Sequence, residues 1–341
     1  MPNLSLHTRV NNFVRWIRPD PDKTEDTRKQ RDDVKDRIRN KAEADGLTVR
    51  SMPHSGSFAD ATGLRRHMLG DADHEGQDVD CPFVLSKKDE DGDPLTALLP
   101  RFEGYAGDTY PETERERTKS SVKLKFAATK LNFDLVPMLA VDGNDDEQIL
   151  LRAGGEKRRT SIQKHVEFIK ARTRKSQDLR GPVAFNDGVR LVKWWREAQV
   201  NETQGKIIAD VPSFLVKLLC AKAFDEASVK AKYPETLVTW FDLISNYAAK
   251  RADISFRDFG VPDPSKITGA KWKVIDPVNT ENSAVPTSWG GIQLDELKEW
   301  AAKARDNVQQ AIAYEMRGRD ADAVEFMCKV FGNSFKHHSE E

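Results

Sequence analysis

The sequence predicts an α+β protein of two lobes, the first built on a mixed sheet and the second built of helices. Strand-like runs gather before about residue 140, whereas apolar residues recur with helical spacing from about residue 159. The 341 residues are enough for one or two domains with a sizeable core. We therefore expect a sheet-containing lobe with an N-terminal helix over 1–158, a helical lobe over 159–341, and a cleft between them.

Composition excludes several classes of protein. Lys and Arg total 54 against 55 Asp and Glu, so net charge argues neither for nor against a nucleic-acid partner. The three cysteines are far apart and share no metal-binding spacing, which is typical of a reduced cytoplasmic protein. No apolar run approaches the roughly 18 residues that span a bilayer, and the N-terminal residues lack the apolar stretch of a signal peptide. We expect no membrane partner.

The first elements in chain order are an arm and a long helix. Residues 1–21 end in Pro-Asp-Pro and predict an arm. Thr24 can cap a helix that runs to about Asp45, where Gly46 ends it. The apolar positions of this helix are few and spaced by four residues, so only a narrow face is expected to be buried.

The strands of the first lobe follow. LTVRSMPHSGS predicts a short strand that turns at Gly56, and DVDCPFVL predicts a second strand with an apolar end. A short helix is expected over 94–105. SVKLKFAA alternates, with Lys123 and Lys125 on the face opposite its apolar residues, and KLNFDLVPML alternates after a short turn. These last two runs predict an antiparallel hairpin within a mixed sheet.

The second lobe consists of helical segments. Four of them run three to five turns each: TSIQKHVEFIKARTRK, FNDGVRLVKWWREAQ, VPSFLVKLLCAKAFDEA and ETLVTWFDLISNYAAKRA. A strand-like interruption is expected at 271–279, before two last helices over about 291–317 and 320–335. Arg172–Arg180 is the expected exposed connector between the lobes.

Two carboxylates stand at the start of the second strand. Asp78 and Asp80 are two residues apart, so on a strand their side chains share one face. This is costly without nearby positive charge, because like charges repel and burial disfavours ionisation. Mg²⁺ prefers hard oxygen ligands and commonly keeps substrate phosphate in its shell. Asp134, between Phe133 and Leu135 that point into the core, can supply the third carboxylate of a two-metal site.

A Gly-Ser pair precedes the acids. Gly56 and Ser57 can present backbone N–H groups and a hydroxyl to a triphosphate, with help from the N-terminus of a following helical turn. A phosphate-binding turn and three metal-binding carboxylates are the groups that nucleotidyl transfer requires. A lone Asp-x-Asp pair is more commonly an exposed strand edge or a turn. The Gly-Ser pair before it and the mid-strand aspartate after it favour catalysis here.

These motifs resemble those of a known family. Ser-Gly-Ser at 55–57, Asp-Val-Asp at 78–80 and Phe-Asp-Leu-Val-Pro at 133–137 are similar to the polymerase-β-type nucleotidyltransferases. Within these, they most resemble the bacterial relatives of cyclic GMP–AMP synthase, the cGAS/DncV-like nucleotidyltransferases (CD-NTases) of antiphage signalling. Three segments of the second lobe match family motifs in the family's order, the R-L-L-K-x-W helix, the S-x-x-L-E-x-L helix and the I-x-D-P segment, at residues 189–195, 212–219 and 274–277.

The resemblance implies a two-lobed polymerase-β-like fold and a role for each of seven residues. The catalytic residues, which would hold two Mg²⁺ ions that Mn²⁺ can replace, are Asp78, Asp80 and Asp134. The residues expected to bind nucleotide are Gly56, Ser57, Lys193 and Ser213. The simpler interpretations of the last two are a solvated helix lysine beside two core tryptophans and an N-cap serine that follows a proline.

One spacing departs from the family pattern. Twenty residues separate the serine of the turn from the first aspartate, which is more than the family usually has. A rival pair, Asp71-Ala72-Asp73, stands at the usual spacing but lacks the apolar alternation of a strand. Asp78 and Asp80 border the apolar run Cys81–Leu85, which can anchor them on a buried strand. We therefore prefer this pair and expect residues 58–77 to form an extra loop over the active site.

The resemblance implies a metal-dependent nucleotidyltransferase of the cytoplasm. It would join nucleoside triphosphates, ATP among them, into a cyclic di- or trinucleotide second messenger in antiphage (CBASS) signalling, with release of pyrophosphate. The alternatives are a linear oligonucleotide synthase of oligoadenylate-synthase type and an inactive nucleotide-binding scaffold, which the presence of all three acids disfavours. No zinc-ribbon spacing is present, so no duplex-DNA activator is expected. We expect a monomer, and a regulatory protein partner stays open.

Overall fold

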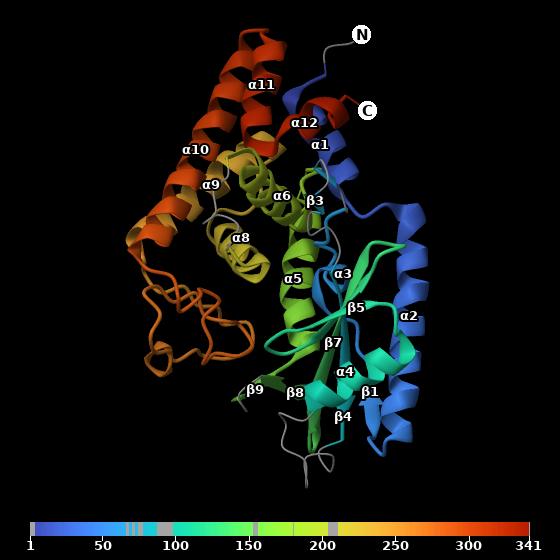
Figure 1. Ribbon diagram of the computed structural model, residues 1–341. Helices are drawn as coiled ribbons and strands as arrows, with labels where there is room; N and C mark the ends of the chain where they lie inside the picture. The colour runs from blue at the N-terminus through green and yellow to red at the C-terminus, as the bar shows by residue number, and fades with distance from the viewer. Residues whose placement is uncertain are drawn as a thin grey trace. The chain divides into compact units, whose positions relative to one another are not determined.

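The computed structural model describes residues 4–65, 68–69, 72–73, 78–86, 98–152, 156–179, 181–203 and 211–340 (Figure 1). The chain divides into two compact units. The sheet unit comprises residues 19–66 and 75–167, and the helical unit comprises residues 1–18, 67–74 and 168–341. The division into domains at residue 158 stays a prediction.

The sheet unit is built on one seven-stranded sheet (Figure 1). Its strands are β1 (Val49–Ser51), β4 (Asp78–Leu85), β5 (Glu114–Arg117), β6 (Val122–Phe126), β7 (Leu131–Val141), β8 (Asn144–Arg152) and β9 (Glu156–Thr160). The order is β1-β4-β7-β6-β5, and β8 pairs with β7 on one side and with β9 on the other. Strands β4 and β7 are parallel and the other pairs are antiparallel. The expected mixed sheet is confirmed, and the expected hairpin is β6 with β7.

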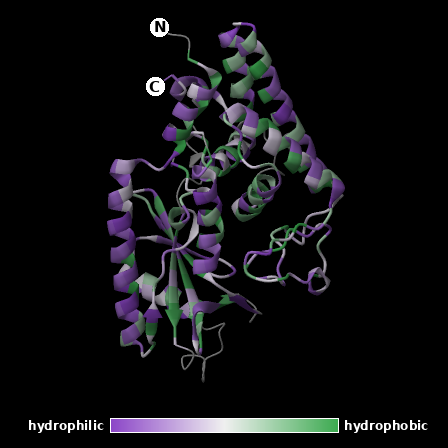
Figure 2. Cartoon of the chain, turned by 180° about the vertical axis from the view of Figure 1, so that it is seen from behind, coloured by the Kyte–Doolittle hydropathy of each residue, from purple (hydrophilic) through white to green (hydrophobic). Residues whose placement is uncertain are grey.

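The core of the sheet unit lies between the sheet and two helices, α2 (Pro21–Ala44) and α4 (Leu98–Thr109). Alternation along β7 sends Phe133 and Leu135 into this core, and both are fully buried. Phe83 of β4 packs edge-on against Phe102 of α4, with ring centroids 5.2 Å apart. Helix α2 buries only a narrow apolar stripe, as its spacing predicts, and Figure 2 shows hydrophilic residues along most of its length.

The N-terminal residues do not form the expected arm. Helix α1 (Leu6–Ile17) occupies most of this segment and belongs to the helical unit. The Ser5 side chain caps it by accepting the backbone N–H of Thr8 at 3.1 Å. Phe13 is fully buried. The prediction was wrong because a serine cap and apolar residues at helical spacing favour a helix here.

Helix α2 begins three residues before the expected cap at Thr24. Asp20 is its N-cap, and its carboxylate accepts the backbone N–H of Asp22 at 3.1 Å. Pro21 takes the first helical position, where its fixed φ suits the helix and its missing N–H costs nothing. The Pro-Asp-Pro sequence therefore starts the helix rather than ending an arm.

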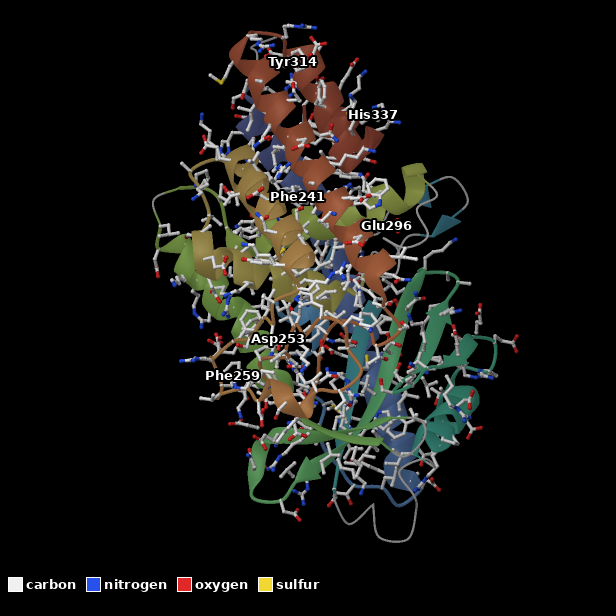
Figure 3. All side chains as sticks on the ribbon, turned by 90° about the vertical axis from the view of Figure 1, so that its left-hand side faces the viewer. Phe241, Asp253, Phe259, Glu296, Tyr314 and His337 are labelled. Atoms are coloured by element: carbon white, nitrogen blue, oxygen red, sulfur yellow. The ribbon has the colours of Figure 1, made fainter. Side chains whose placement is uncertain are left out.

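Helices dominate the second half of the chain (Figure 1). They are α5 (Ile162–Gln177), α6 (Phe185–Thr203), α8 (Ser213–Ala227), α9 (Tyr233–Lys250), η3 (Pro264–Lys266), α10 (Gly291–Met316), α11 (Asp320–Phe331) and α12 (Asn333–His338). Aromatic residues join them. Phe241 of α9, labelled in Figure 3, packs edge-on against Trp195 of α6 with centroids 5.0 Å apart. Tyr314 of α10, also labelled there, stacks on Phe326 of α11 at 5.3 Å.

Two expectations for this half are wrong. The segment from Arg172 is helical rather than a connector, because α5 continues through it to Gln177, although Arg174 and Lys175 are exposed as expected. Arg172 is buried and forms ion pairs with Asp225 at 2.6 Å and Asp258 at 2.9 Å. These two carboxylates compensate the buried positive charge. The expected strand at 271–279 is reduced to two isolated bridges within the described residues. None of the described helices combines the length and apolar character needed to cross a membrane.

Candidate active site

The parallel pairing of β4 with β7 brings the three predicted carboxylates together. The register places Asp80 directly opposite Asp134, and Asp78 opposite Asn132. Neighbouring strands are about 4.8 Å apart, so Asp80 and Asp134 are adjacent. Asp78 is two residues before Asp80 on the same strand, and its side chain is on the same face. The residue before Asp134, Phe133, points to the other face and is fully buried. We call the side that carries the aspartates the acidic face.

Strand β6 adds a positive charge to the acidic face. Lys123 is the register partner of Asp134. Its Nζ lies 2.9 Å from Asp78 Oδ2 and 4.0 Å from Asp134 Oδ2. The Lys123, Asp78 and Asp134 side chains are 20%, 30% and 15% exposed, so water screens this cluster only partly. The Ser121 hydroxyl donates a hydrogen bond of 2.9 Å to Asp134 Oδ1, which orients that carboxylate.

The Gly-Ser turn lies against the acidic face. Gly56 is the first residue of the short helix α3 (Gly56–Ala59) and has φ +70°. A Cβ atom built on Gly56 would overlap Asp80 Oδ2 and would lie 2.9 Å from Asp80 Cγ. Any other residue would therefore face a left-handed backbone and a carboxylate in its way. The predicted turn and a predicted catalytic acid are in direct contact within the sheet unit.

Hydrogen bonds within the chain hold the turn in shape. The Gly56 carbonyl accepts the N–H of Asp60 at 3.1 Å, and the Ser57 carbonyl accepts the N–H groups of Thr62 and Gly63 at 3.0 and 2.9 Å. The Asp60 carboxylate accepts both the N–H and the hydroxyl of Thr62, at 3.1 and 2.6 Å. Since Asp60 and Thr62 are buried, the turn is a rigid feature rather than a loose loop.

Sequence reasoning missed Lys35 and did not place Lys123 beside the acids. Lys35 of α2 is buried, and its Nζ donates to the carbonyls of Met52 and Pro53 at 2.9 Å each, just before the turn. Burial lowers the pKa of this ammonium. Nothing in the sequence distinguishes Lys35 from the other charged residues of α2. The polar side of β6 was predicted to carry Lys123, but only the strand register places it beside the acids.

The two candidate residues of the second lobe lie in the helical unit. Lys193 of α6 is buried, so its interpretation as a solvated lysine is wrong. Ser213 is the first residue of α8, and its hydroxyl accepts a hydrogen bond of 2.9 Å from Arg196. Pro212 takes the N-cap position itself, so the N-cap interpretation of Ser213 is wrong too. Contact of either residue with a nucleotide stays a prediction.

The oxygen donors of the acidic face suit a divalent cation. Asp78 Oδ1 is buried and accepts no hydrogen bond from any described residue. Three carboxylates with such an unsatisfied oxygen match the hard ligands that Mg²⁺ prefers. Across the described ranges, no three His, Cys, Asp or Glu side chains are already gathered around a point where a metal could bind. The Lys123 ammonium lies 2.9 Å from the other oxygen of Asp78.

Asp73 of the rival acid pair belongs to the helical unit. Ala72–Asp73 forms β3, which pairs with β2 (Met68–Leu69) in a separate two-stranded sheet. The expectation that this segment forms no strand is wrong, because backbone pairing alone sustains two residues without apolar alternation. Asp71 itself lies outside the described residues. So do several other positions of the predicted loop over the active site, at 66–67, 70 and 74–77.

Known proteins resemble this chain in sequence and in fold. The profile of the Second Messenger Oligonucleotide or Dinucleotide Synthetase (SMODS) domain matches residues 4–175. The cyclic AMP-AMP-AMP synthase of Escherichia coli (strain MS 115-1) is 28% identical over 296 residues, which are 85% of this chain and 84% of that protein. The structure of E. coli MS115-1 CdnC with ATP has a TM-score of 0.74 and 26% identity, covering 97% of this chain and 99% of that one. CdnC in complex with HORMA-deltaN gives 0.73 and 27%, covering 96% and 98%.

These similarities confirm the expected α+β fold, with its mixed sheet and helical part, and the expected class of enzyme. The SMODS match covers half of the chain and includes the Gly-Ser turn, all three aspartates and Lys123. The chain belongs to the family of Second Messenger Oligonucleotide or Dinucleotide Synthetase domains, the nucleotidyltransferases that make cyclic oligonucleotide messengers.

Proposed function

We propose that this enzyme uses ATP to make a cyclic oligoadenylate of three AMP units, with the acidic face as its catalytic centre. The observation that carries the proposal is the register of β4 with β7, which sets Asp80 beside Asp134 and against the Gly56 turn. The E. coli relative named cyclic AMP-AMP-AMP synthase supports the choice of product, and the ATP-bound CdnC structure supports the choice of substrate. A mixed or two-membered ring is the second candidate.

In this proposal Asp78, Asp80 and Asp134 hold two Mg²⁺ ions, for which Mn²⁺ can substitute. Metal ions at such a site stabilise the charge that develops on the attacking and leaving oxygens. The Ser121 hydroxyl holds the Asp134 carboxylate in orientation. Gly56 leaves room for Asp80 beside the turn, so the triphosphate-binding segment and a catalytic acid keep a fixed separation.

The turn binds the triphosphate of the donor nucleotide through the N–H groups of Gly56 and Ser57 and the Ser57 hydroxyl. A ribose hydroxyl of the acceptor attacks the donor α-phosphate in line. A new P–O bond forms, the bond to pyrophosphate breaks, and the hydroxyl proton is lost to solvent or base. Repetition extends the chain, and a last attack by its own end closes the ring.

We further propose that a helical domain over 159–341 completes the nucleotide cleft of a catalytic domain over 1–158. Lys193 and Ser213 are its contributions, touching the phosphates or base of the donor. Burial holds the Lys193 side chain, and the hydrogen bond from Arg196 holds the Ser213 hydroxyl. Fixed side chains favour a defined role. Alanine at either position should raise the KM for ATP more than it lowers kcat.

A regulatory protein partner is also part of the proposal. CdnC forms a complex with a HORMA protein, and that resemblance favours a comparable partner for this enzyme, which we place in the bacterial cytoplasm in antiphage signalling. Purified enzyme assayed alone and with candidate partners measures this directly. An enzyme that is fully active alone and binds none of them would argue against regulation of this kind.

The experiment that tests the activity is incubation with labelled ATP, GTP, CTP or UTP, singly and mixed, with Mg²⁺ or Mn²⁺. ATP alone is expected to give a phosphatase-resistant product with the mass of three cyclised AMP units. A phosphatase-sensitive ladder would instead identify a linear synthase. If no pyrophosphate is released even when a candidate protein partner is added, the protein is an inactive nucleotide-binding scaffold.

A further inference from the structure

We propose that Lys123 is an internal counter-cation of the acidic face: its ammonium offsets part of the negative charge in the metal-free enzyme and competes with a metal ion for Asp78. The inference rests on the proposed role of these aspartates as metal ligands. It assigns Lys123 a function that none of the motifs implies, that of setting how tightly the bare site holds a divalent cation.

The geometry carries this assignment. Lys123 Nζ lies 2.9 Å from Asp78 Oδ2 and within 4.0 Å of Asp134 Oδ2, so one ammonium serves two proposed ligands. It comes from β6, the strand next to β7, as the register partner of Asp134. The backbone therefore fixes its origin on the acidic face, and only the side chain is free to move. The other Asp78 oxygen, Oδ1, is buried without a described hydrogen-bond partner.

Charge then decides the order of events. A metal ion and the ammonium repel each other at short range, and partial burial weakens the screening by water. A metal ion must therefore either displace the ammonium or bind in spite of this repulsion. Without nucleotide, the site then binds the metal ion less tightly than three carboxylates without the lysine would. A nucleoside triphosphate brings negative charge of its own, which offsets the lysine. Lys123 should thus make metal and nucleotide bind together rather than metal first.

Lys125 offers a matched control. It lies two residues along β6, on the same side of the strand, and pairs with Asn132 in the register. Its ammonium instead forms ion pairs with Glu114 at 2.7 Å and Glu116 at 3.1 Å. Lys125→Met removes the same charge from the same strand, but from a different set of carboxylates.

The experiment measures Mn²⁺ binding to the metal-free protein by electron paramagnetic resonance, with and without a nonhydrolysable ATP analogue. Lys123→Met is expected to bind Mn²⁺ roughly three- to tenfold more tightly than the wild type in the absence of nucleotide. Its metal-free melting temperature should fall, because the aspartates lose their counter-charge. The cooperativity between Mn²⁺ and the analogue should shrink, whereas Lys125→Met should leave the Mn²⁺ affinity unchanged.

Unchanged or weaker Mn²⁺ binding by Lys123→Met would overturn the inference, as would an equal gain in Lys125→Met. If Lys123→Met fails to fold by circular dichroism, Lys123→Gln replaces it with the same expected direction. Asp78→Asn separates this inference from the proposed function. If that variant binds Mn²⁺ as the wild type does, the metal site itself is wrongly assigned, whatever Lys123 does.

Discussion

Two clusters of charged residues in this molecule differ in how completely their charges are satisfied. In the helical unit, Asp187 is buried, and its carboxylate forms ion pairs with Arg18 and Arg190 at 2.7 Å each. The Tyr233 hydroxyl donates a further hydrogen bond of 3.1 Å to the same carboxylate. We call this set the Asp187 cluster. Its anion is surrounded by donors, as a buried structural charge must be.

The acidic face is different. It sets Asp80 beside Asp134 and pairs Asp78 with Lys123, and the buried Oδ1 of Asp78 lacks a hydrogen bond among the described residues. A fold gains nothing from a buried carboxylate oxygen without a donor, because its desolvation is not offset by a hydrogen bond. The comparison teaches that the balance of charge, rather than the number of charged residues, separates a structural cluster from a site that awaits a cation.

The largest expected effect is the loss of catalysis on changing one acid of the acidic face. Asp80→Asn should lower pyrophosphate release at least about a thousandfold, because one ligand oxygen and one negative charge are lost where the metal would bind. The melting temperature should hold or rise, since repulsion with Asp134 is relieved. The control is Asp71→Asn, which should keep its activity. The reverse pattern would move the catalytic role to the rival pair.

The next effect is on stability, in the Asp187 cluster. Asp187→Asn should lower the free energy of unfolding by about 3 kcal/mol, because the buried ion pair with Arg190 is broken. Urea unfolding measures this loss. Asp295→Asn, which breaks the exposed ion pair with Arg251, should cost no more than about 0.5 kcal/mol. Comparable losses in both variants would mean that the buried ion pairs of the Asp187 cluster stabilise the fold no more than an exposed pair does.

Gly56→Ala should follow, with activity reduced about a hundredfold, because the new methyl group displaces the Asp80 carboxylate from its place beside the turn. Gly143→Ala is the matched control. It has nearly the same φ, +73° against +70°, and no atom within 4 Å of the added carbon. It should cost about 1 kcal/mol of stability and leave the steady-state rate unchanged. Equal losses of activity would mean that backbone strain, not the clash, matters.

The smallest effect concerns pH and His7, at the N-terminal helix. Burial lowers the pKa of His7 below 6.5, and its neutral Nδ1 accepts the backbone N–H of Tyr233 at 3.2 Å. The unfolded chain binds the proton more readily, so stability is complete above pH 6.5 and is lost as pH falls through the lowered pKa. We expect at most about 1 kcal/mol. His7→Gln, which keeps an acceptor, should flatten the pH dependence of urea unfolding between pH 5 and 7.

Much of the candidate site could be predicted from short-range patterns. Alternation assigned β7 and placed Asp134 on the face opposite Phe133, and the two-residue spacing put Asp78 and Asp80 on one side of β4. The glycine of the turn was also predicted. These features follow from the geometry of a single strand or turn, so neighbours in the sequence suffice to reveal them.

Other features depended on contacts between distant segments. The ion pair of Lys123 with Asp78 joins residues 45 positions apart, and the Lys35 bonds to the carbonyls before the turn join α2 to a separate segment. The misplaced connector at Arg172 has the same origin. A stretch rich in Arg and Lys suggested exposure, but aspartates far along the chain bury that arginine in ion pairs.

The sequence by itself therefore determined the fold class, the family and the common face of Asp78 and Asp80, because side-chain periodicity and motif chemistry are local properties. Only the tertiary structure decided the register of β4, β7 and β6. That register makes Asp80 and Asp134 neighbours, brings Lys123 to the aspartates and presses Gly56 against one of them. The physical reason is that strand pairing is selected by the packing of the whole core, to which residues far apart in the chain contribute together.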